Sequence, residues 1–187
     1  MDISVLPIII LLPLVLGTTL VSWLKQFSRG VTALAAIGIS LSSLVLLLLH
    51  APDVLNGQVI QQTWRWLPEL GLNLSFRLDA LGLLFALLIS GIGTLIFIYA
   101  YYYLGPKNSL SKLYMLLMLF MAAMLGIALS NNLILLLTFW ELTSISSFLL
   151  VGYWSNYDAA QRGSRMALTI TGMGGLGLLG GFILLGQ

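Results

Sequence analysis

The sequence contains no cysteine, a single histidine and few charged side chains. Without cysteine, the chain forms neither disulfides nor thiolate-ligated metal or iron–sulfur centres. His50 alone cannot make the histidine cluster that a metal site requires. The lysines and arginines are scattered rather than gathered into a patch, which argues against nucleic-acid binding. We therefore expect no cofactor, no bound metal and no nucleic-acid partner.

Hydrophobic residues make up 59% of the 187 residues, and charged residues only 7%. Soluble domains carry about 25% charged residues. A core of this size cannot hide so much apolar surface from water. The composition therefore predicts an all-α integral membrane protein with one membrane domain over residues 1–187. Six segments are long enough to cross the hydrocarbon core as helices. They are residues 3–24, 31–50, 80–104, 110–129, 132–153 and 165–185.

The connection over residues 51–78 is the only long stretch predicted to lie outside lipid. Its segment "LNLSFRL" alternates strictly between apolar and polar residues, a pattern that is typical of a strand with one buried face. The preceding "QVIQQTWRWL" is a candidate partner strand, with "PELG" as the turn. The sequence thus predicts a small β-hairpin on the membrane surface between the second and third helices.

Six of the eight basic residues fall in alternate connections of this six-helix plan. They are Lys25, Arg29, Lys107, Lys112, Arg162 and Arg165. Because basic residues favour the cytoplasmic side, these connections are predicted to be cytoplasmic. The hairpin and both ends of the chain are then extracytoplasmic.

Glycines gather in the last segment, which reads "GMGGLGLLGG". The run matches a GxGxxG pattern, but no strand precedes it, so nucleotide binding is not favoured. Gly177 and Gly181 form a small-xxx-small pair, which favours close contact with another helix. The residues from Ser90 to Thr94 indicate a second close contact in the third segment.

Glu141 interrupts the apolar stretch "NLILLLTFWELTSISSFLLVGYW". It lies about nine residues into its helix, which is about 14 Å deep and close to the bilayer midplane. A charged side chain there costs at least about 2.5–3.5 kcal/mol on insertion scales. Burial favours the protonated carboxyl, and a carboxyl poised between neutral and charged forms suits a proton relay. We therefore predict Glu141 as a proton-path residue.

Three hydroxyls are predicted to support Glu141, because Thr138, Ser144 and Ser130 project in similar directions on a regular helix. Ordinary interhelical hydrogen bonding is the alternative role for them. Glu141 itself has a simpler alternative, a permanently neutral carboxyl bonded between helices. Every lysine and arginine lies in a loop or at a helix end. Glu141 is therefore protonated at rest, or its cationic partner lies outside these 187 residues.

Two further titratable residues lie at the predicted outer surface. Asp79 directly precedes a helix, where aspartate is a favourable N-cap; a role in proton entry is the alternative. His50 ends the second helix, and histidine is a residue type that often carries protons in proteins. Solvation at the interface is the simpler reading of His50, with proton entry again the alternative.

Two motifs carry a resemblance to a known family. "FRLDALGLLFALLISGIGTLIFIYAYYYL" and "LSNNLILLLTFWELTSISSFLLVGYW" resemble the large subunit of Mrp-type multisubunit sodium/proton antiporters. That protein is similar to the antiporter-like membrane subunits of respiratory complex I. The resemblance implies that Glu141 matches the fifth-helix glutamate of the family's proton path. It also implies a multi-pass protein of the bacterial inner membrane.

The resemblance further implies a secondary transporter component rather than an enzyme, with proton entry coupled to sodium efflux in a hetero-oligomeric complex. Family members are longer, and their seventh-helix lysine would lie beyond Gln187. We therefore expect this chain to be the N-terminal portion of a larger subunit. Two alternatives stay open: a proton-translocating subunit of a complex I-like or hydrogenase-type complex, and a non-transporting membrane scaffold.

Overall fold

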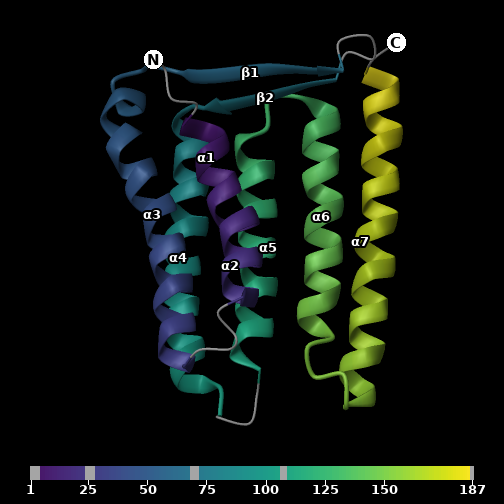
Figure 1. The fold of residues 1–187 in the computed structure, drawn as a ribbon. Helices are drawn as coiled ribbons and strands as arrows, with labels where there is room; N and C mark the ends of the chain where they lie inside the picture. The colour runs from purple at the N-terminus through teal and green to yellow at the C-terminus, as the bar shows by residue number, and fades with distance from the viewer. Residues whose placement is uncertain (1–4, 24–27, 68–71, 106–108, 186–187) are drawn as a thin grey trace.

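The computed structural model describes residues 5–23, 28–67, 72–105 and 109–185. Figure 1 shows helices running alternately up and down, with a two-stranded sheet lying across one end. In chain order the elements are α1 (Val5–Leu11), η1 (Leu12–Leu16), α2 (Gly17–Trp23), α3 (Arg29–Leu55), β1 (Ile60–Leu67), β2 (Leu72–Leu78), α4 (Ala80–Tyr103), α5 (Leu110–Leu129), α6 (Leu133–Val151) and α7 (Asp158–Leu185).

Five helices in the described residues are long and apolar enough to cross a membrane: α3, α4, α5, α6 and α7. The predicted first span is not one regular helix, because its described part is divided into α1, the π-helix η1 and α2. Pro13 lies in η1 and lacks the N–H that an α-helix would use to bond the Ile9 carbonyl. The Ser43 hydroxyl of α3 donates to that carbonyl at 3.3 Å. The count of six spans stays a prediction.

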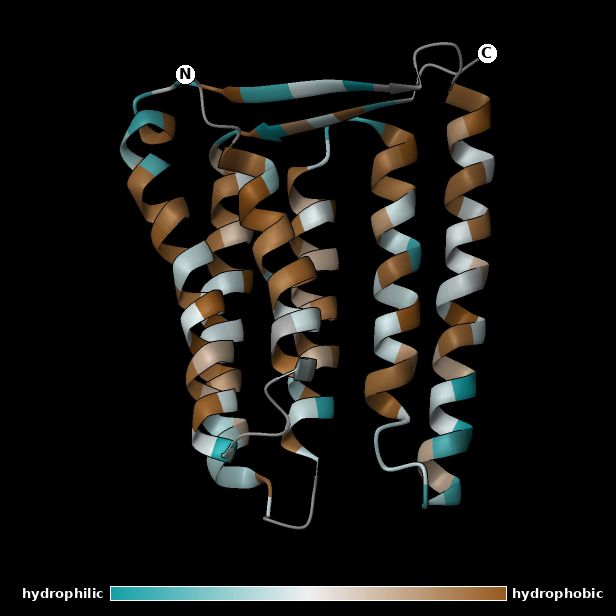
Figure 2. Cartoon of the chain, in the orientation of Figure 1, coloured by the Kyte–Doolittle hydropathy of each residue, from teal (hydrophilic) through white to brown (hydrophobic). Residues whose placement is uncertain are grey.

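Two helices are longer than their apolar sequences indicate. α3 continues through Pro52 to Leu55, and α7 begins at Asp158 rather than at residue 165. Asp158 in the first turn of α7 is favourable beside the free N–H groups of the helix start. Hydropathy locates the part of a helix inside lipid, but a helix also includes polar turns beyond it. Figure 2 shows this polar colour where α7 begins.

The predicted hairpin forms. β1 and β2 pair antiparallel from Ile60 opposite Leu78 to Leu67 opposite Leu72, with an irregularity between Arg65 and Leu67. Its predicted turn, residues 68–71, lies outside the described residues. β2 contacts α1, α4, α5 and α6. Phe76 and Leu78 are buried on the face that the alternating sequence predicts to be apolar.

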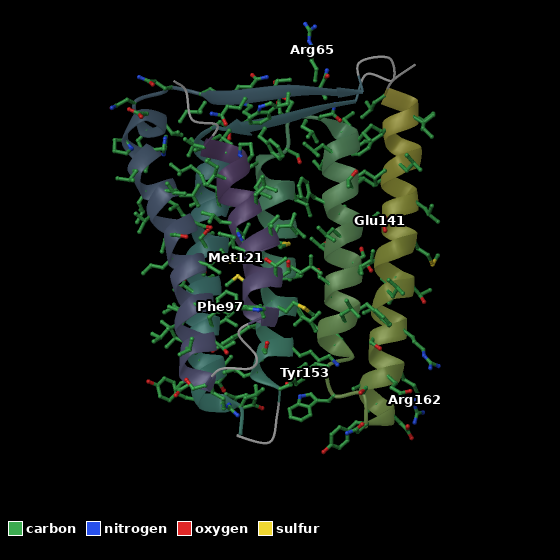
Figure 3. The ribbon with its side chains drawn as sticks, viewed as in Figure 1. Arg65, Phe97, Met121, Glu141, Tyr153 and Arg162 are labelled. Atoms are coloured by element: carbon green, nitrogen blue, oxygen red, sulfur yellow. The ribbon has the colours of Figure 1, made fainter. Side chains whose placement is uncertain are left out.

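The helical segments from α1 to α5 enclose a core that includes paired polar groups. The Ser40 and Thr94 hydroxyls lie 2.8 Å apart between α3 and α4. Tyr114 of α5 donates to the Phe97 carbonyl of α4 at 2.8 Å, and their rings pack edge to face. The predicted close contact at Ser90–Thr94 is therefore confirmed at Thr94. A residue larger than glycine at Gly93 would approach Met121, which Figure 3 labels with Phe97.

α1 begins and α7 ends at the hairpin end of the bundle (Figure 1). Arg29 and Lys112 are in the first turns of α3 and α5, and Arg162 and Arg165 in the first two turns of α7. All four therefore lie toward the end opposite the hairpin. Lys25 and Lys107 lie outside the described residues. The charge distribution that predicts orientation is thus kept in the fold, and the identity of the cytoplasmic side stays a prediction.

Candidate functional site

Glu141 lies in the middle of α6. Asn132 caps this helix, because its side-chain oxygen accepts from the N–H groups of Ile134 at 2.8 Å and Leu135 at 3.2 Å. The helix then continues without interruption to Val151. Glu141 is therefore about 12 Å along the helix axis from its first residue, at 1.5 Å per residue. The ribbon of α6 shows hydrophilic colour between hydrophobic turns (Figure 2).

α6 lies between two glycine-containing helices. The Phe139 ring packs onto Gly126 of α5, where a Cβ atom would overlap the ring. Two residues later, the Glu141 carboxyl packs onto Gly175 of α7, where a Cβ would overlap the carboxyl oxygen. Residues two apart on a helix project about 200° from each other, so these contacts lie on opposite faces. Figure 3 shows Glu141 extending toward α7.

The carboxyl of Glu141 has close steric contacts but no polar partner among the described residues. Its Cδ atom would be 3.1 Å from a Cβ at Gly175, and no described side chain hydrogen-bonds or ion-pairs with it. Glu141 is only partly buried within the chain. In the part of the chain that the structure describes, no group of three or more acidic, histidine or cysteine side chains is placed to hold a metal ion.

The three predicted supporting hydroxyls donate to carbonyls of their own segments rather than to Glu141. Ser144 donates to Trp140 at 3.2 Å, and Thr138 to Ile134 at 2.9 Å. Ser130 donates to Gly126 at 2.6 Å. These are bonds to the carbonyl four residues earlier, which satisfy a hydroxyl in an apolar environment. The structure thus joins none of the three to Glu141 by a hydrogen bond.

Trp140 contributes a polar atom beside the glutamate. Its indole N–H is buried and finds no acceptor among the described residues. Its ring approaches the same α7 surface, since the indole Cδ1 is 3.4 Å from a Cβ built at Gly175. Buried N–H groups normally have an acceptor in the protein or in ordered water. The α6–α7 contact therefore contains a carboxyl and an N–H donor that the described residues leave without hydrogen bonds.

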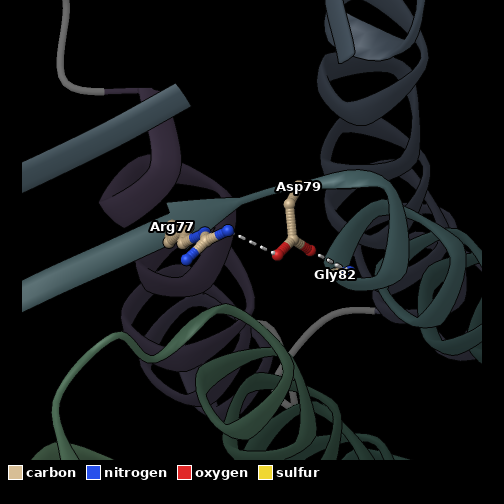
Figure 4. Close-up of polar contacts among 3 residues, drawn as sticks. All are labelled: Arg77, Asp79 and Gly82. Carbon is tan, nitrogen blue, oxygen red and sulfur yellow. Dashed lines mark hydrogen bonds and ion pairs between the residues drawn. The ribbon is translucent and has the colours of Figure 1, made fainter. Parts of the chain in front are cut away.

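Asp79 and His50 lie toward the hairpin end of the bundle, away from the middle of α6. One Asp79 oxygen accepts from the Gly82 N–H at 2.8 Å, which confirms the predicted N-cap. The other lies 3.3 Å from a guanidinium nitrogen of Arg77, as Figure 4 shows. His50 Nδ1 is 2.8 Å from the Leu46 carbonyl oxygen. The structure gives neither residue a contact with Glu141.

The glycine contact of Glu141 is the feature that sequence reasoning missed. The run "GMGG" indicates a close helix contact, but the pattern favours Gly177 and Gly181. A Cβ at either of those positions meets nothing within 4 Å, whereas Gly175 contacts Glu141. A surface partner for Gly177 and Gly181 stays a prediction. Two features of the sequence could have indicated this contact: an acid in one apolar helix and a glycine run in the next.

The fold, with an acid in the middle of one apolar helix, defines the class of protein: a multi-pass membrane protein built mainly from membrane-length helices. Two family descriptions match its sequence. Residues 64–114 match the N-terminus of complex I chain 5, and residues 130–187 match the membrane region shared by NADH:quinone oxidoreductase and Mrp antiporters. The chain belongs to this family of complex I and Mrp antiporter membrane subunits, as its two motifs indicate.

Curated relatives and solved structures agree with the family. The chain is 41% identical over 97% of its length to the A1 subunit of the Na(+)/H(+) antiporter of Staphylococcus aureus, and it spans 23% of that protein. The Mrp complex of Dietzia sp. DQ12-45-1b contains a chain with a TM-score of 0.77 and 26% identity; the match covers 94% of this chain and 18% of that one.

A second solved structure shares the fold at lower sequence identity. It is the membrane-bound sulfane sulfur reductase, an archaeal respiratory membrane complex, with a TM-score of 0.79 and 23% identity. The match covers 94% of this chain and 26% of that one. The chain therefore spans less than a quarter of the Staphylococcus aureus protein. It spans 18% and 26% of the matching chains in the two solved structures.

Proposed function

We propose that this chain acts as a membrane component of a multisubunit sodium/proton antiporter, in which Glu141 takes up and releases protons coupled to sodium efflux. The observation that carries the proposal is the carboxyl in the middle of α6, which has no polar partner among the described residues. An ionisable group at membrane depth is costly and is by default functional. The name of the Staphylococcus aureus relative supports antiport as the activity.

The surroundings of Glu141 suit proton transfer rather than tight structural binding. A structural carboxyl would be held by hydrogen bonds in both directions, since unpaired polar groups are unfavourable in lipid. Glu141 instead lies against Gly175, which has no side chain, and beside an indole N–H that has no acceptor among the described residues. Both groups are available to ordered water or to a partner side chain. We propose that such partners complete the proton path.

The rest of the assembly is part of this proposal. Only 6% of the apolar stretch of α7 is buried, and 17% of that of α6, so both helices offer surface to other protein segments or lipid. We propose partner subunits in a hetero-oligomeric complex of the bacterial inner membrane. By the positive-inside rule, the basic ends of α3, α5 and α7 are cytoplasmic and the hairpin is extracytoplasmic.

The test is Glu141→Gln in the full-length protein within its assembled complex. Glutamine keeps the size and most contacts of the side chain but cannot exchange a proton. We expect sodium-dependent proton movement in everted membrane vesicles to collapse while the amount of assembled complex stays unchanged. Glu141→Asp should retain part of the exchange, because it keeps a carboxyl closer to the backbone.

The matched control is Asp158→Asn, the same acid-to-amide change at the exposed start of α7. It should leave exchange near the wild-type level. Full exchange in Glu141→Gln vesicles would instead identify Glu141 as a neutral packing group and favour the non-transporting scaffold. Loss of assembly in Glu141→Gln, but not in Asp158→Asn, would also favour a structural role.

A second candidate is a proton-translocating subunit of a complex I-like respiratory assembly. The match of residues 64–114 to complex I chain 5 and the fold shared with the sulfane sulfur reductase favour it specifically. The two candidates differ in what drives the proton. An antiporter exchanges ions in response to an imposed sodium gradient alone, whereas a respiratory complex requires electron donor and acceptor. Exchange in vesicles without either redox partner separates them.

A further inference from the structure

A cavity lies between α5, α6 and α7 at the end of the bundle opposite the hairpin. Its volume is about 370 Å³. It is separate from the contact between Glu141 and Gly175, which is near the middle of α6. Two cationic side chains line it, Lys112 from α5 and Arg165 from α7, together with the polar side chain of Gln161. Among the described residues that line it, none is acidic.

The deeper wall of this cavity is apolar. Met115 and Leu116 of α5 line one side, and Phe148 and Leu149 of α6 line another. Arg165 and Lys112 are both exposed, so their charges lie where an aqueous interface meets the apolar wall. Long basic side chains at helix ends place their charged groups at this level of a membrane. The cavity therefore combines a cationic rim with an apolar interior.

The aromatic residue beside the rim adds no negative charge. The Lys112 ammonium lies 5.8 Å from the ring centroid of Tyr153, close enough for a cation–π contact. The Tyr153 hydroxyl donates to the Ser109 carbonyl at 3.0 Å. Burial raises the pKa of Tyr153, against the opposing charge of Arg29, so this phenol stays neutral at physiological pH. Figure 3 shows Tyr153 near the lower end of α6.

We propose that this cavity binds an anionic phospholipid, with the headgroup phosphate between Lys112 and Arg165 and an acyl chain along Met115 and Phe148. Basic pockets between membrane helices recognise anionic headgroups. Here neither the cationic rim nor the apolar wall alone would be enough to identify a lipid. A free anion would not use the apolar wall. A zwitterionic lipid would bring its own cation toward two fixed positive charges. The combination thus selects a lipid that carries net negative charge.

The test uses the full-length protein in its purified assembly, reconstituted in phosphatidylcholine nanodiscs that contain phosphatidylglycerol with a photoactivatable acyl chain. After illumination, labelled peptides are identified by mass spectrometry. We expect labelling on the peptides that contain Met115 and Phe148, and competition by unlabelled phosphatidylglycerol. Near an anionic lipid each basic residue contributes roughly fivefold in affinity, so Lys112→Gln/Arg165→Gln should weaken labelling by roughly 30-fold.

Two matched variants separate the site from general charge and folding effects. Arg162→Gln removes the same charge one turn away, from a residue that does not line the cavity, and should label like the wild type. Lys112→Arg/Arg165→Lys keeps both charges and should also retain labelling. Figure 3 shows Arg162 at the lower end of α7.

Several results would overturn the proposal. Equal competition by phosphatidylcholine would mean nonselective boundary lipid. Competition by inorganic phosphate alone would mean a free-anion site. Absence of label from these peptides in the assembly would mean that another protein segment fills the cavity. Unchanged labelling in the double glutamine variant would remove the role of the two cations. None of these readouts depends on ion exchange, so each is independent of the proposed antiport.

Discussion

The helices before Ser130 and the two helices after it differ in how much of their apolar surface is buried within the chain. In the apolar stretches of α3, α4 and α5, 39%, 33% and 50% of residues are buried, against 17% in α6 and 6% in α7. The first group pairs several of its buried hydroxyls, as Ser40 does with Thr94, and leaves that of Ser90 without a partner among the described residues. The second group contains the Glu141 and Trp140 groups that have no partner among the described residues.

This difference separates a scaffold from a site that depends on its surroundings. Exposed apolar surface as extensive as that of α7 is stable only against lipid or another protein segment. An acid in the second group can change protonation without disrupting a network, because it has no described network to disrupt. Polar changes in the first group should therefore alter stability, and those in the second should alter exchange.

The largest effect is expected at the joint between the two groups. Gly126→Ala places a Cβ inside the space of the Phe139 ring. Overpacking of this kind costs about 1–3 kcal/mol, and both helices must separate to relieve it. We expect a lower unfolding temperature and less assembled protein, together with weaker exchange. Thermal unfolding of the purified protein followed by tryptophan fluorescence measures the first effect.

The control for the joint is Gly91→Ala, since a Cβ at Gly91 meets nothing within 4 Å. It should leave the unfolding temperature the same or higher, because alanine favours helix over glycine by about 1 kcal/mol. The double variant Gly126→Ala/Phe139→Ala should have a higher unfolding temperature than Phe139→Ala alone. Equal stability of Gly126→Ala and Gly91→Ala would contradict the close approach of α5 and α6.

The next effect concerns exchange rather than stability. Gly175→Ala forces the Glu141 carboxyl away from its position against α7. Because the Glu141 side chain is flexible and only partly buried, we expect a modest change in unfolding temperature. We expect a clear loss of sodium-dependent proton exchange. Vesicle fluorescence with a pH-sensitive dye measures the loss. A Cβ at Gly177, in the same helix, would have open space around it. Gly177→Ala should therefore keep wild-type exchange.

Restoring the space offers a sharper test of that contact. Glu141→Asp shortens the side chain by one methylene and should fit beside an alanine at 175. If the carboxyl position matters, Gly175→Ala/Glu141→Asp should exchange better than Gly175→Ala alone. Equal activity of Gly175→Ala and the wild type would show that the position of the carboxyl against α7 is unimportant for proton transfer.

Local sequence signals predicted much of the fold. Apolar length located α4 and α5 to within one residue of their observed ends, and period-two alternation located β2. The N-cap of Asp79 followed from its place before an apolar run. These features depend on nearby residues, so a single sequence contains the information needed to predict them.

Features that depend on helix rotation and neighbours were less predictable. The direction of each hydroxyl near Glu141 follows from local bonds to the helix, which compete with any bond to the carboxyl. The choice of Gly175 over Gly177 depends on how α7 turns toward α6, which no periodicity specifies. Similarly, apolar length predicted one span over residues 3–24 and did not predict the π-helix η1, which contains Pro13.

A smaller effect is expected inside the first group. Tyr114→Phe removes the hydroxyl that donates to the Phe97 carbonyl at 2.8 Å. A buried hydrogen bond of this kind contributes about 0.5–1.5 kcal/mol, and the ring packing remains. We expect a small decrease in unfolding temperature with unchanged exchange. A loss of exchange without a loss of stability would place this bond in the proton path and blur the distinction between the two groups.

The smallest effect is expected where the hairpin meets α4. Asp79→Asn removes a titratable carboxyl and its ion pair with Arg77, but asparagine caps a helix about as well as aspartate. Side chains as exposed as these make ion pairs of about 0–1 kcal/mol. We therefore expect near-wild-type stability and exchange, whereas Asp79→Ala should cost about 1 kcal/mol because it removes the cap.

Exchange in Asp79→Asn vesicles distinguishes the two acids directly. Asp79 has a capping bond and a cation beside it, so its charge already serves the structure, whereas Glu141 has neither among the described residues. If Asp79→Asn abolished exchange while the unfolding temperature stayed constant, protons would enter through the hairpin end and the first group would be more than a scaffold. Arg77→Gln then decides the cause, because it removes the ion pair but leaves the Asp79 carboxyl able to take up a proton.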